Sequence, residues 1–407
     1  MSELHDEMTP VAEAESKAPP CARCAGDDTV PHNHDVKAPA WITEKAGKFL
    51  KARRADVFIG KSKIVEVSCD QTALKALELL LENNVMSCPV FYQKYTAVGD
   101  GADAAVVAPV GNPEYLGFVD CLDLAVLATR TGLHTTPTGG LMDKLARWFD
   151  PDTSGSVSHA INLSRADRFW TCQPTTSLGK IVALMAERVH RVAVLDPETN
   201  MVVGIISQSG LLRKLAENMD MLGDEVTKPI STFLPRLKSG TITGSVAGAG
   251  AGTGEAASSP AVLSVKQGAP ARAALELMAA NNVSGVALVD DEGRLVTNMS
   301  ASDVRMMARE SLEKFDVLEL PCLEFVSRMR EAAAKAGIKS HSNFVAESER
   351  KVDRAICISA TDSLMTVINL LTASHLHRVY VVDSEGHPTG VVSITDIMAI
   401  ISGRTAL

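Results

Sequence analysis

Gly390-Val-Val-Ser-Ile-Thr-Asp396 is the stretch of sequence that decides the fold, because its pattern occurs four times along the chain. In every copy an apolar strand ends in a small polar cluster, and a helical pattern begins directly after it. The other copies are Gly117-Phe-Val-Asp-Cys-Leu-Asp123, Gly204-Ile-Ile-Ser-Gln-Ser-Gly210 and Thr297-Asn-Met-Ser-Ala-Ser-Asp303. Their last residues are separated by 87, 93 and 93 positions, which is too long for a solenoid repeat and suits a small βαββα module.

Repeat four shows the helix and strand patterns that such a module requires. Leu364, Val367, Ile368 and Leu371 follow the i, i+3, i+4, i+7 spacing of a helix with one apolar face. Val379-Tyr-Val-Val382 is a short β-branched run followed by turn-forming residues. Because such modules stack in pairs to cover their sheets, we predict an α/β (α+β) fold of four βαββα repeats arranged as two pseudo-dimeric halves.

Composition and insertions divide the chain into repeats and linkers. The first residues lack apolar periodicity and are predicted to be disordered, and a Gly- and Ala-rich stretch before repeat three is predicted to be a flexible linker. Repeat one carries an insertion, which we place in a surface hairpin or loop at 93–113. The predicted divisions are a tail (1–38), a leading helix (39–55), repeat one (56–132), a linker (133–156), repeat two (157–220), a linker (221–257), repeat three (258–312), a helical linker (313–351) and repeat four (352–404).

The composition is that of an ordinary globular protein with an acidic balance. Apolar residues make up 46% of the chain, and the formal net charge is −9. Because basic and acidic residues are mixed along the chain, no basic surface for nucleic acid or an anionic membrane is predicted. No apolar run reaches the roughly 18 residues of a transmembrane helix. The cysteines are mostly single within apolar patterns, which is typical of reduced thiols, so we expect the cytoplasm or the nucleus.

Two short motifs resemble metal sites but match them poorly. Cys21-Ala-Arg-Cys24 is followed by His32 and His34, which are spaced more closely than a zinc finger requires, so we favour an inert tail. Residues 150–158 match the first nine positions of a calcium-binding EF-hand loop, but Ile161 stands at position twelve, where a bidentate Glu is needed. A tight polar turn is the favoured interpretation there, and no metal ligand is predicted.

The polar clusters place an Asp at the start of a helix in three of the four repeats, as Asp123, Asp303 and Asp396. Such an Asp can accept hydrogen bonds from the two vicinal hydroxyls of a ribose, or it can cap the helix N-terminus. Its recurrence in register favours the ribose interpretation. Neighbouring hydroxyls, which can cap the helix or bind a phosphate together with the first-turn amides, are those of Ser300, Ser302, Ser393 and Thr395.

The four repeats resemble cystathionine-β-synthase-type (CBS) domains, which pair into Bateman modules and bind adenine nucleotides in the cleft between partners. The finer resemblance is to the γ regulatory subunit of the AMP-activated, sucrose-non-fermenting-type protein kinase. It rests on His190-Arg191 in repeat two, His377-Arg378 in repeat four, Ser284 in repeat three and the missing Asp of repeat two. Residues 160–170 are also similar to linkers of plant and algal γ-like proteins.

The resemblance implies an adenine-nucleotide sensor that requires no cofactor and binds AMP, ADP or ATP. It implies that the two His-Arg pairs and Ser284 meet nucleotide phosphates, for which Arg offers a planar, permanently charged donor fork. For a single His-Arg pair, the alternative is a surface strand residue beside a packed imidazole. The implied protein partners are the catalytic α-type and scaffold β-type subunits of the kinase.

Repeat one departs from the pattern of the γ family. It has Met86 where the family has Arg, and Asp120 and Leu122 where the other copies have hydroxyls. A carboxylate at residue 120 would repel a phosphate, so the site of Asp123 is expected to bind weakly or not at all.

Repeat two also departs, because Ser209-Gly210 stands where the family carries basic residues. We therefore expect one or two occupied sites, those of Asp303 and Asp396. Three functions fit: a γ-like kinase subunit, a stand-alone CBS-repeat protein that binds an adenosyl ligand and regulates a non-kinase partner, or a scaffold with decayed sites. Catalysis is the least favoured function, since no nucleophile–base pair, P-loop or metal cluster accompanies the repeats.

Overall fold

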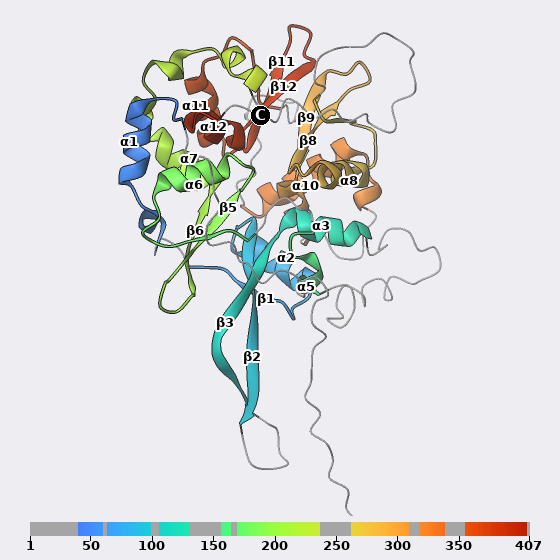
Figure 1. Cartoon of the computed structure of the whole chain (residues 1–407). Helices are drawn as coiled ribbons and strands as arrows, with labels where there is room; N and C mark the ends of the chain where they lie inside the picture. The colour runs from blue at the N-terminus through green and yellow to red at the C-terminus, as the bar shows by residue number, and fades with distance from the viewer. Residues whose placement is uncertain are drawn as a thin grey trace, which may run out of the picture. The chain divides into compact units, whose positions relative to one another are not determined.

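The computed structural model describes residues 40–59, 63–98, 106–130, 156–163, 169–236, 262–308, 317–337 and 355–404. All four predicted repeats are represented in these ranges (Figure 1). The N-terminal tail with its Cys and His cluster, most of the EF-hand-like segment and the Gly-rich linker lie outside them.

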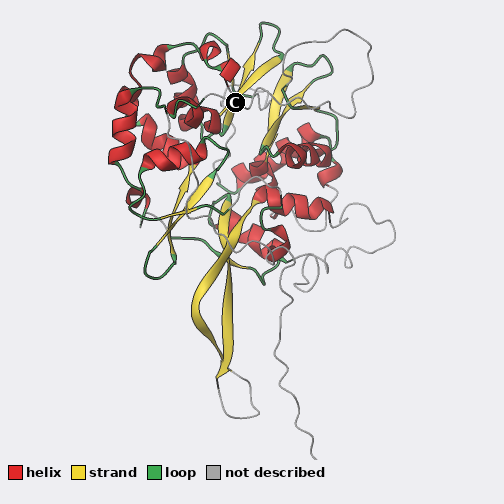
Figure 2. Cartoon of the chain, viewed as in Figure 1, coloured by secondary structure: helices red, strands yellow, loops and turns green. Residues whose placement is uncertain are grey.

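Each repeat builds a three-stranded sheet with the same strand order and pairing (Figure 2). The first strand runs parallel to the second, and the third runs antiparallel to the second. The predicted α/β (α+β) fold of βαββα repeats is thus confirmed. The strands are β1 (Val67–Ser68), β2 (Ser87–Val98) and β3 (Val106–Asp120); β4 (Thr171–Cys172), β5 (Arg191–Leu195) and β6 (Val202–Ser207); β7 (Ser264–Lys266), β8 (Gly285–Val289) and β9 (Leu295–Ser300); and β10 (Cys357–Ile358), β11 (Arg378–Val382) and β12 (Pro388–Ser393).

Hydroxyl side chains fix where the first helix of most repeats begins. Thr72, Ser177 and Ser363 each accept a hydrogen bond from the backbone amide three residues further on, which satisfies a donor that the first turn leaves unpaired. The paired helices of the repeats are α2 (Ala73–Glu82) and α3 (Cys121–Arg130), α6 (Leu178–Met185) and α7 (Gln208–Ala216), α8 (Ala271–Asn281) and α9 (Ala301–Val304), and α11 (Leu364–Ala373) and α12 (Ile394–Ile401). Helices and turns outside these pairs are α1 (Glu44–Ala52), η1 (Ala55–Phe58), α5 (Val157–Ala160), η2 (Met219–Thr227), η3 (Ile230–Thr232), η4 (Leu234–Arg236), η6 (Arg305–Ala308) and α10 (Cys322–Lys335).

The sheets of repeats one and two pack together, as do those of repeats three and four. Phe118 of β3 is buried with Ala193 and Val202 of repeat two, and its ring lies 5.1 Å from that of Phe169, centroid to centroid. In the other half, the Leu295 amide donates to the Gly386 carbonyl oxygen at 2.9 Å. These contacts give the two pseudo-dimeric halves that the stacking argument predicts.

The helices add a second pairing that crosses the halves. One large apolar core joins repeat one to repeat three, and α3 packs against α8 and α9 within it. A second core joins repeat two to repeat four, where α6 packs on α12 and α7 on α11. Every repeat is therefore covered by one neighbour through its sheet and by another through its helices, and all four meet around a common centre.

The insertion in repeat one lengthens β2 and β3 into a hairpin that projects beyond the rest of its sheet (Figure 1). Pairing continues from Ser87 opposite Asp120 as far as Val98 opposite Val106. Near its tip, Tyr95 is 57% exposed, so this part of the hairpin contributes little to the core. No helix in the described ranges has the length and apolar character needed to span a bilayer.

Candidate functional site

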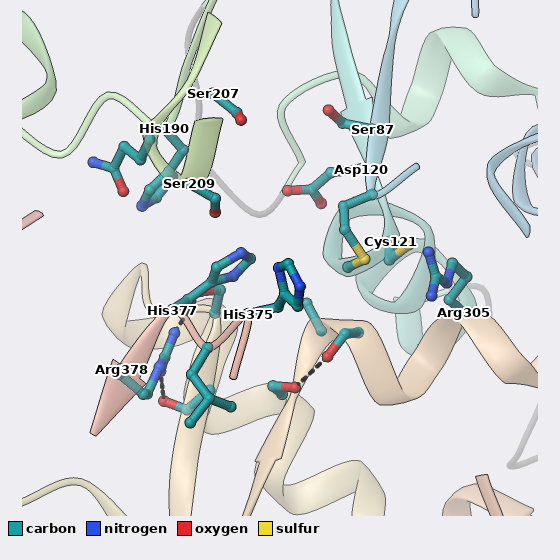
Figure 3. A pocket seen from close by; sticks show the side chains of 18 of the residues that line it. Ser87, Asp120, Cys121, His190, Ser207, Ser209, Arg305, His375, His377 and Arg378 are labelled. Carbon is teal, nitrogen blue, oxygen red and sulfur yellow. Dashed lines mark hydrogen bonds between the residues drawn. The ribbon is translucent and has the colours of Figure 1, made fainter. Parts of the chain in front are cut away.

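A cavity of about 620 Å³ lies where the four repeats meet (Figure 3). It is lined by the junctions between strands and helices, so the repeated polar clusters converge on it. Ten of the twelve residues predicted to bind nucleotide line this cavity: His190, Arg191, Ser284, Ser300, Ser302, Asp303, His377, Arg378, Ser393 and Thr395. The two that do not line it are Asp123 and Asp396.

The lining of the cavity is strongly basic in a chain whose net charge is −9. Among the described residues, two acidic ones, Asp120 and Asp303, line it. Three imidazoles, those of His190, His375 and His377, also face it (Figure 3). The seven lining cations are Lys63, Arg188, Arg191, Arg213, Arg305, Arg330 and Arg378. Such a cluster of like charges is unfavourable by itself and attracts a polyanion.

Arg378 of repeat four is anchored to repeat three. Its guanidinium donates to the Gly285 carbonyl oxygen and, at 2.5 Å, to the Ser284 hydroxyl. A Cβ at Gly285 would lie 2.8 Å from the Arg378 guanidinium, so this approach requires glycine. Burial lowers the pKa of Arg378, and nearby Tyr380 and Asp396 oppose the shift. Arg378 and Ser284, which were both predicted to meet the ligand, thus lie in contact at one site. The same contacts join repeat four to repeat three.

Asp303 is the centre of a buried polar network. Its carboxylate accepts from the backbone amide and hydroxyl of Ser300, at 2.8 and 3.0 Å, and thereby caps α9. Its other oxygen accepts from Arg330 Nε of α10 at 3.1 Å. Arg330 also donates to the Thr297 hydroxyl at 3.1 Å and to the Asn298 carbonyl oxygen at 2.8 Å. In this structure Asp303 therefore both caps a helix and neutralises a buried arginine.

Sequence reasoning missed Arg330, although a signal for it was present. α10 buries a stripe formed by Phe325, Val326, Met329 and Ala333, and residue 330 falls within that stripe. A charge on the buried side of a helix requires a partner, which here is Asp303.

Asp123 and Asp396 act as helix caps. Asp396 accepts from the amide and hydroxyl of Ser393 at 2.8 and 2.7 Å, which forms a capping box at the start of α12. Asp123 accepts from the Asp120 amide at 3.0 Å, and the Asp120 carboxylate accepts from the Asp123 amide at 2.8 Å. Asp396 and Asp123 are both buried, at 1% and 3% exposure respectively. The cap, which the sequence left open as an alternative to ribose binding, is the contact that the structure shows.

Repeats two and four are joined by a neutral network. The Gln208 amide nitrogen lies within hydrogen-bond distance of the Met185 and Val189 carbonyl oxygens, at 3.1 Å each, and of the Thr395 hydroxyl at 2.9 Å. Gln208 is only 6% exposed, so these contacts satisfy a group that burial would otherwise penalise. The Thr395 hydroxyl predicted to meet the ligand is thus also a link between repeats.

The repeat-one side of the cavity has a different character. Arg191 of repeat two pairs with the Asp120 carboxylate at 3.6 Å, and both side chains are largely buried. The predicted departure at residue 120 is therefore offset by a cation from the neighbouring repeat. Cys121 follows directly, and burial raises the pKa of its thiol to about 12, so that the thiol is neutral. Within the part of the chain that the structure describes, no group of His, Cys, Asp or Glu side chains is arranged to hold a metal ion.

Comparison with known proteins finds CBS domains within the chain. The CBS-domain family model matches residues 165–217, 255–299 and 351–403, which fall in repeats two, three and four. Repeat one, which carries the insertion, is outside the matched segments but has the same sheet topology. The chain therefore contains CBS domains in repeats two, three and four.

Its relatives refine that assignment. An Arabidopsis thaliana protein named SNF1-related protein kinase regulatory subunit gamma-like PV42b is 25% identical over 381 residues, which cover 88% of this chain and 96% of that protein. The protein SDS23 of Yarrowia lipolytica is 27% identical over 387 residues, which cover 87% of this chain and 66% of SDS23. The chain spans between 33% and 66% of the SDS23 proteins that it matches. It thus resembles a γ-like regulatory subunit, and neither relative bears the name of an enzyme.

A solved structure supports the fold. A Methanocaldococcus jannaschii protein proposed as an archaeal homologue of γ-AMPK superposes with a TM-score of 0.53 and 15% identity. The match covers 85% of this chain and 99% of that protein. At this identity the likeness bears on the arrangement of the four repeats alone.

Proposed function

We propose that the chain binds an adenine nucleotide in its central cavity and acts as a γ-like regulatory subunit of an SNF-type protein kinase. The observation that carries the proposal is the charge of that cavity, where seven Lys and Arg residues face two Asp residues. Arg and phosphate form strong charge-assisted hydrogen bonds, so a nucleotide phosphate is the natural complement of this lining.

The rest of the cavity suits the nucleoside part of such a ligand. Its volume of about 620 Å³ lies within the range of roughly 300–1,000 Å³ that small-molecule sites occupy. Apolar side chains that include Val65, Leu263 and Val283 line it beside the polar clusters, and they offer surfaces for a base. A carboxylate can accept up to about four hydrogen bonds, and Asp303 already accepts three, from the Ser300 amide, the Ser300 hydroxyl and Arg330. It can therefore accept one more from a ribose hydroxyl while it retains Ser300 and Arg330.

The role in a kinase complex rests on the relatives. PV42b is named as a γ-like regulatory subunit, and it matches this chain over nearly its whole length. We therefore propose catalytic α-type and scaffold β-type subunits as partners, a binding role without catalysis, and the cytoplasm or nucleus as the location. A regulatory ligand shifts such a complex only by its difference in affinity for the two states of the complex.

The SDS23 relatives favour a second candidate, because their names do not identify them as kinase subunits. In that case the chain binds the same class of ligand but regulates a different partner. Affinity purification of the tagged chain from its own cells, followed by identification of stoichiometric partners, separates the candidates. A co-purifying SNF-type catalytic subunit supports the first, and its absence with another stoichiometric partner supports the second.

Calorimetric titration of the purified chain with AMP tests the shared part of both proposals. We expect saturable binding with a dissociation constant below a millimolar and a stoichiometry of one or two. GMP and adenosine, titrated in parallel, report whether the base and the phosphate are recognised. No heat with AMP, ADP or ATP at millimolar concentration would leave a scaffold without a ligand as the better account.

A further inference from the structure

One buried arginine in the cavity, Arg305, has no carboxylate partner among the residues that the structure describes. Arg305 begins η6, directly after α9, and is only 4% exposed. Within the described ranges its Nε has no hydrogen-bond partner, and no carboxylate pairs with its guanidinium. Moving a cation out of water without an opposite charge or hydrogen bonds is costly, so such a residue requires compensation.

The fold itself does not require an arginine at this place. Residue 305 lies two positions after the register residue 303, and the equivalent positions in the other repeats are Ala125, Leu212 and Met398. These three are buried apolar residues, at 2%, 1% and 0% exposure. Repeat three alone places a charge there, at the point where η6 packs on α2 of repeat one.

The described residues around Arg305 do not neutralise its charge. Figure 3 shows Arg305 beside Cys121, whose thiol is protonated because burial raises its pKa to about 12. Asp120, the acidic residue that repeat one contributes to the described lining of the cavity, pairs with Arg191 and caps α3. Burial also lowers the pKa of Arg305, as expected for a charge without a counterion.

We propose that Arg305 is the anchor for a phosphate group of the ligand on the repeat-one side of the cavity. Arg191 lines the same cavity and supplies a second cation, and its pairing with Asp120 at 3.6 Å offsets the carboxylate on that side. This inference rests on the proposed function for the nucleotide, but the phosphate chemistry is also that of free phosphate or pyrophosphate. It assigns the anionic end of the ligand to repeats one and three.

The test compares Arg305→Met, Arg305→Lys and a control, Arg294→Met, with the unmodified chain. Met is the residue that repeat four uses at the equivalent position, so the variant suits the fold. Arg294 is an exposed arginine of the same repeat, whose pairing with Asp290 at 3.9 Å is on the surface. Each protein is titrated with AMP, adenosine and pyrophosphate, and its thermal midpoint without ligand is recorded.

For Arg305→Met we expect at least a tenfold loss of AMP affinity, adenosine affinity unchanged within twofold, and a midpoint equal to or above that of the unmodified chain. Arg305→Lys should retain more AMP affinity than Arg305→Met, and Arg294→Met should be unchanged. Equal loss of AMP and adenosine together with a lower midpoint would show a structural role and overturn the proposal. AMP affinity within twofold of the unmodified chain would also overturn it, while leaving the proposed function intact.

The remaining outcomes separate the ligand from its anchor. If the unmodified chain binds pyrophosphate but neither AMP nor adenosine, the nucleotide function fails, and loss of pyrophosphate binding in Arg305→Met still supports the anchor. If the unmodified chain binds none of the three, the anchor and the nucleotide function are both wrong.

Discussion

Arg330 and Arg305 are both buried beside repeat three, yet their surroundings differ completely. Arg330, at 6% exposure, donates to Asp303, Thr297 and Asn298. Arg305 is 4% exposed, and within the described ranges its Nε has no hydrogen-bond partner. The first arginine belongs to the architecture, because the protein itself supplies its counterion. The described part of the chain supplies no counterion for the second, and this difference is what we use to distinguish a structural charge from a charge proposed to bind a ligand.

Removing Arg330 should give the largest effect. Arg330→Met leaves the Asp303 carboxylate buried without its cation, and breaking such a pair costs about 3–5 kcal/mol of stability. Chemical denaturation of the variant against the unmodified chain measures this loss. Adding Asp303→Asn should restore part of it, because the uncompensated charge is then gone. A stability change below about 1 kcal/mol would mean that water rather than Arg330 satisfies Asp303.

Gln208 extends the comparison to a neutral buried group. Gln208→Leu should destabilise the chain by about 2–3 kcal/mol, because the Thr395 hydroxyl and two backbone carbonyls lose a donor. Thr395→Val removes one of these contacts and should cost less. If the double variant is no less stable than Gln208→Leu alone, the two side chains act as one unit across repeats two and four.

Arg305→Met should change stability in the opposite direction. Replacing an unpaired buried charge by an apolar side chain of similar length is neutral or stabilising, so we expect a gain of about 1 kcal/mol without ligand. Saturating AMP should narrow or reverse the difference, since the unmodified chain binds it more tightly. Differential scanning calorimetry with and without AMP measures both parts. A lower thermal unfolding midpoint for the variant without ligand would mean that Arg305, like Arg330, has a structural role.

Much of the fold was available in the sequence, because the strand pattern and its polar cluster recur in register. That register predicted five of the residues that line the cavity, Ser300, Ser302, Asp303, Ser393 and Thr395, since equivalent strand–helix junctions converge when repeats pack together. The resemblance to the γ family supplied the other five, which are Ser284 and the two His-Arg pairs. Arg305 was detectable in the same alignment as a charge where Ala125, Leu212 and Met398 are apolar. The pairing of helices between repeats one and three was not predictable, because the apolar helix faces of the four repeats are alike. The role of each Asp also stayed open, since a cap and a ribose ligand require the same residue at the same place.

Asp396→Ala separates those two roles and is the smallest effect that we predict. As a cap, Asp396 should contribute about 1 kcal/mol, because the Ser393 amide and hydroxyl lose their acceptor. The ribose interpretation predicts a loss of roughly ten- to a hundredfold in AMP affinity. The carboxylate does not line the cavity, so we expect AMP affinity to change by no more than about threefold, in line with the few tenths of a kcal/mol of an indirect effect. Asp396→Asn, which keeps an acceptor for the amide, should retain most of the stability, and calorimetric titration of both variants measures the affinity. A tenfold loss in both would show that the ligand reaches Asp396 and that cap and ribose contact coexist there, as they can at Asp303.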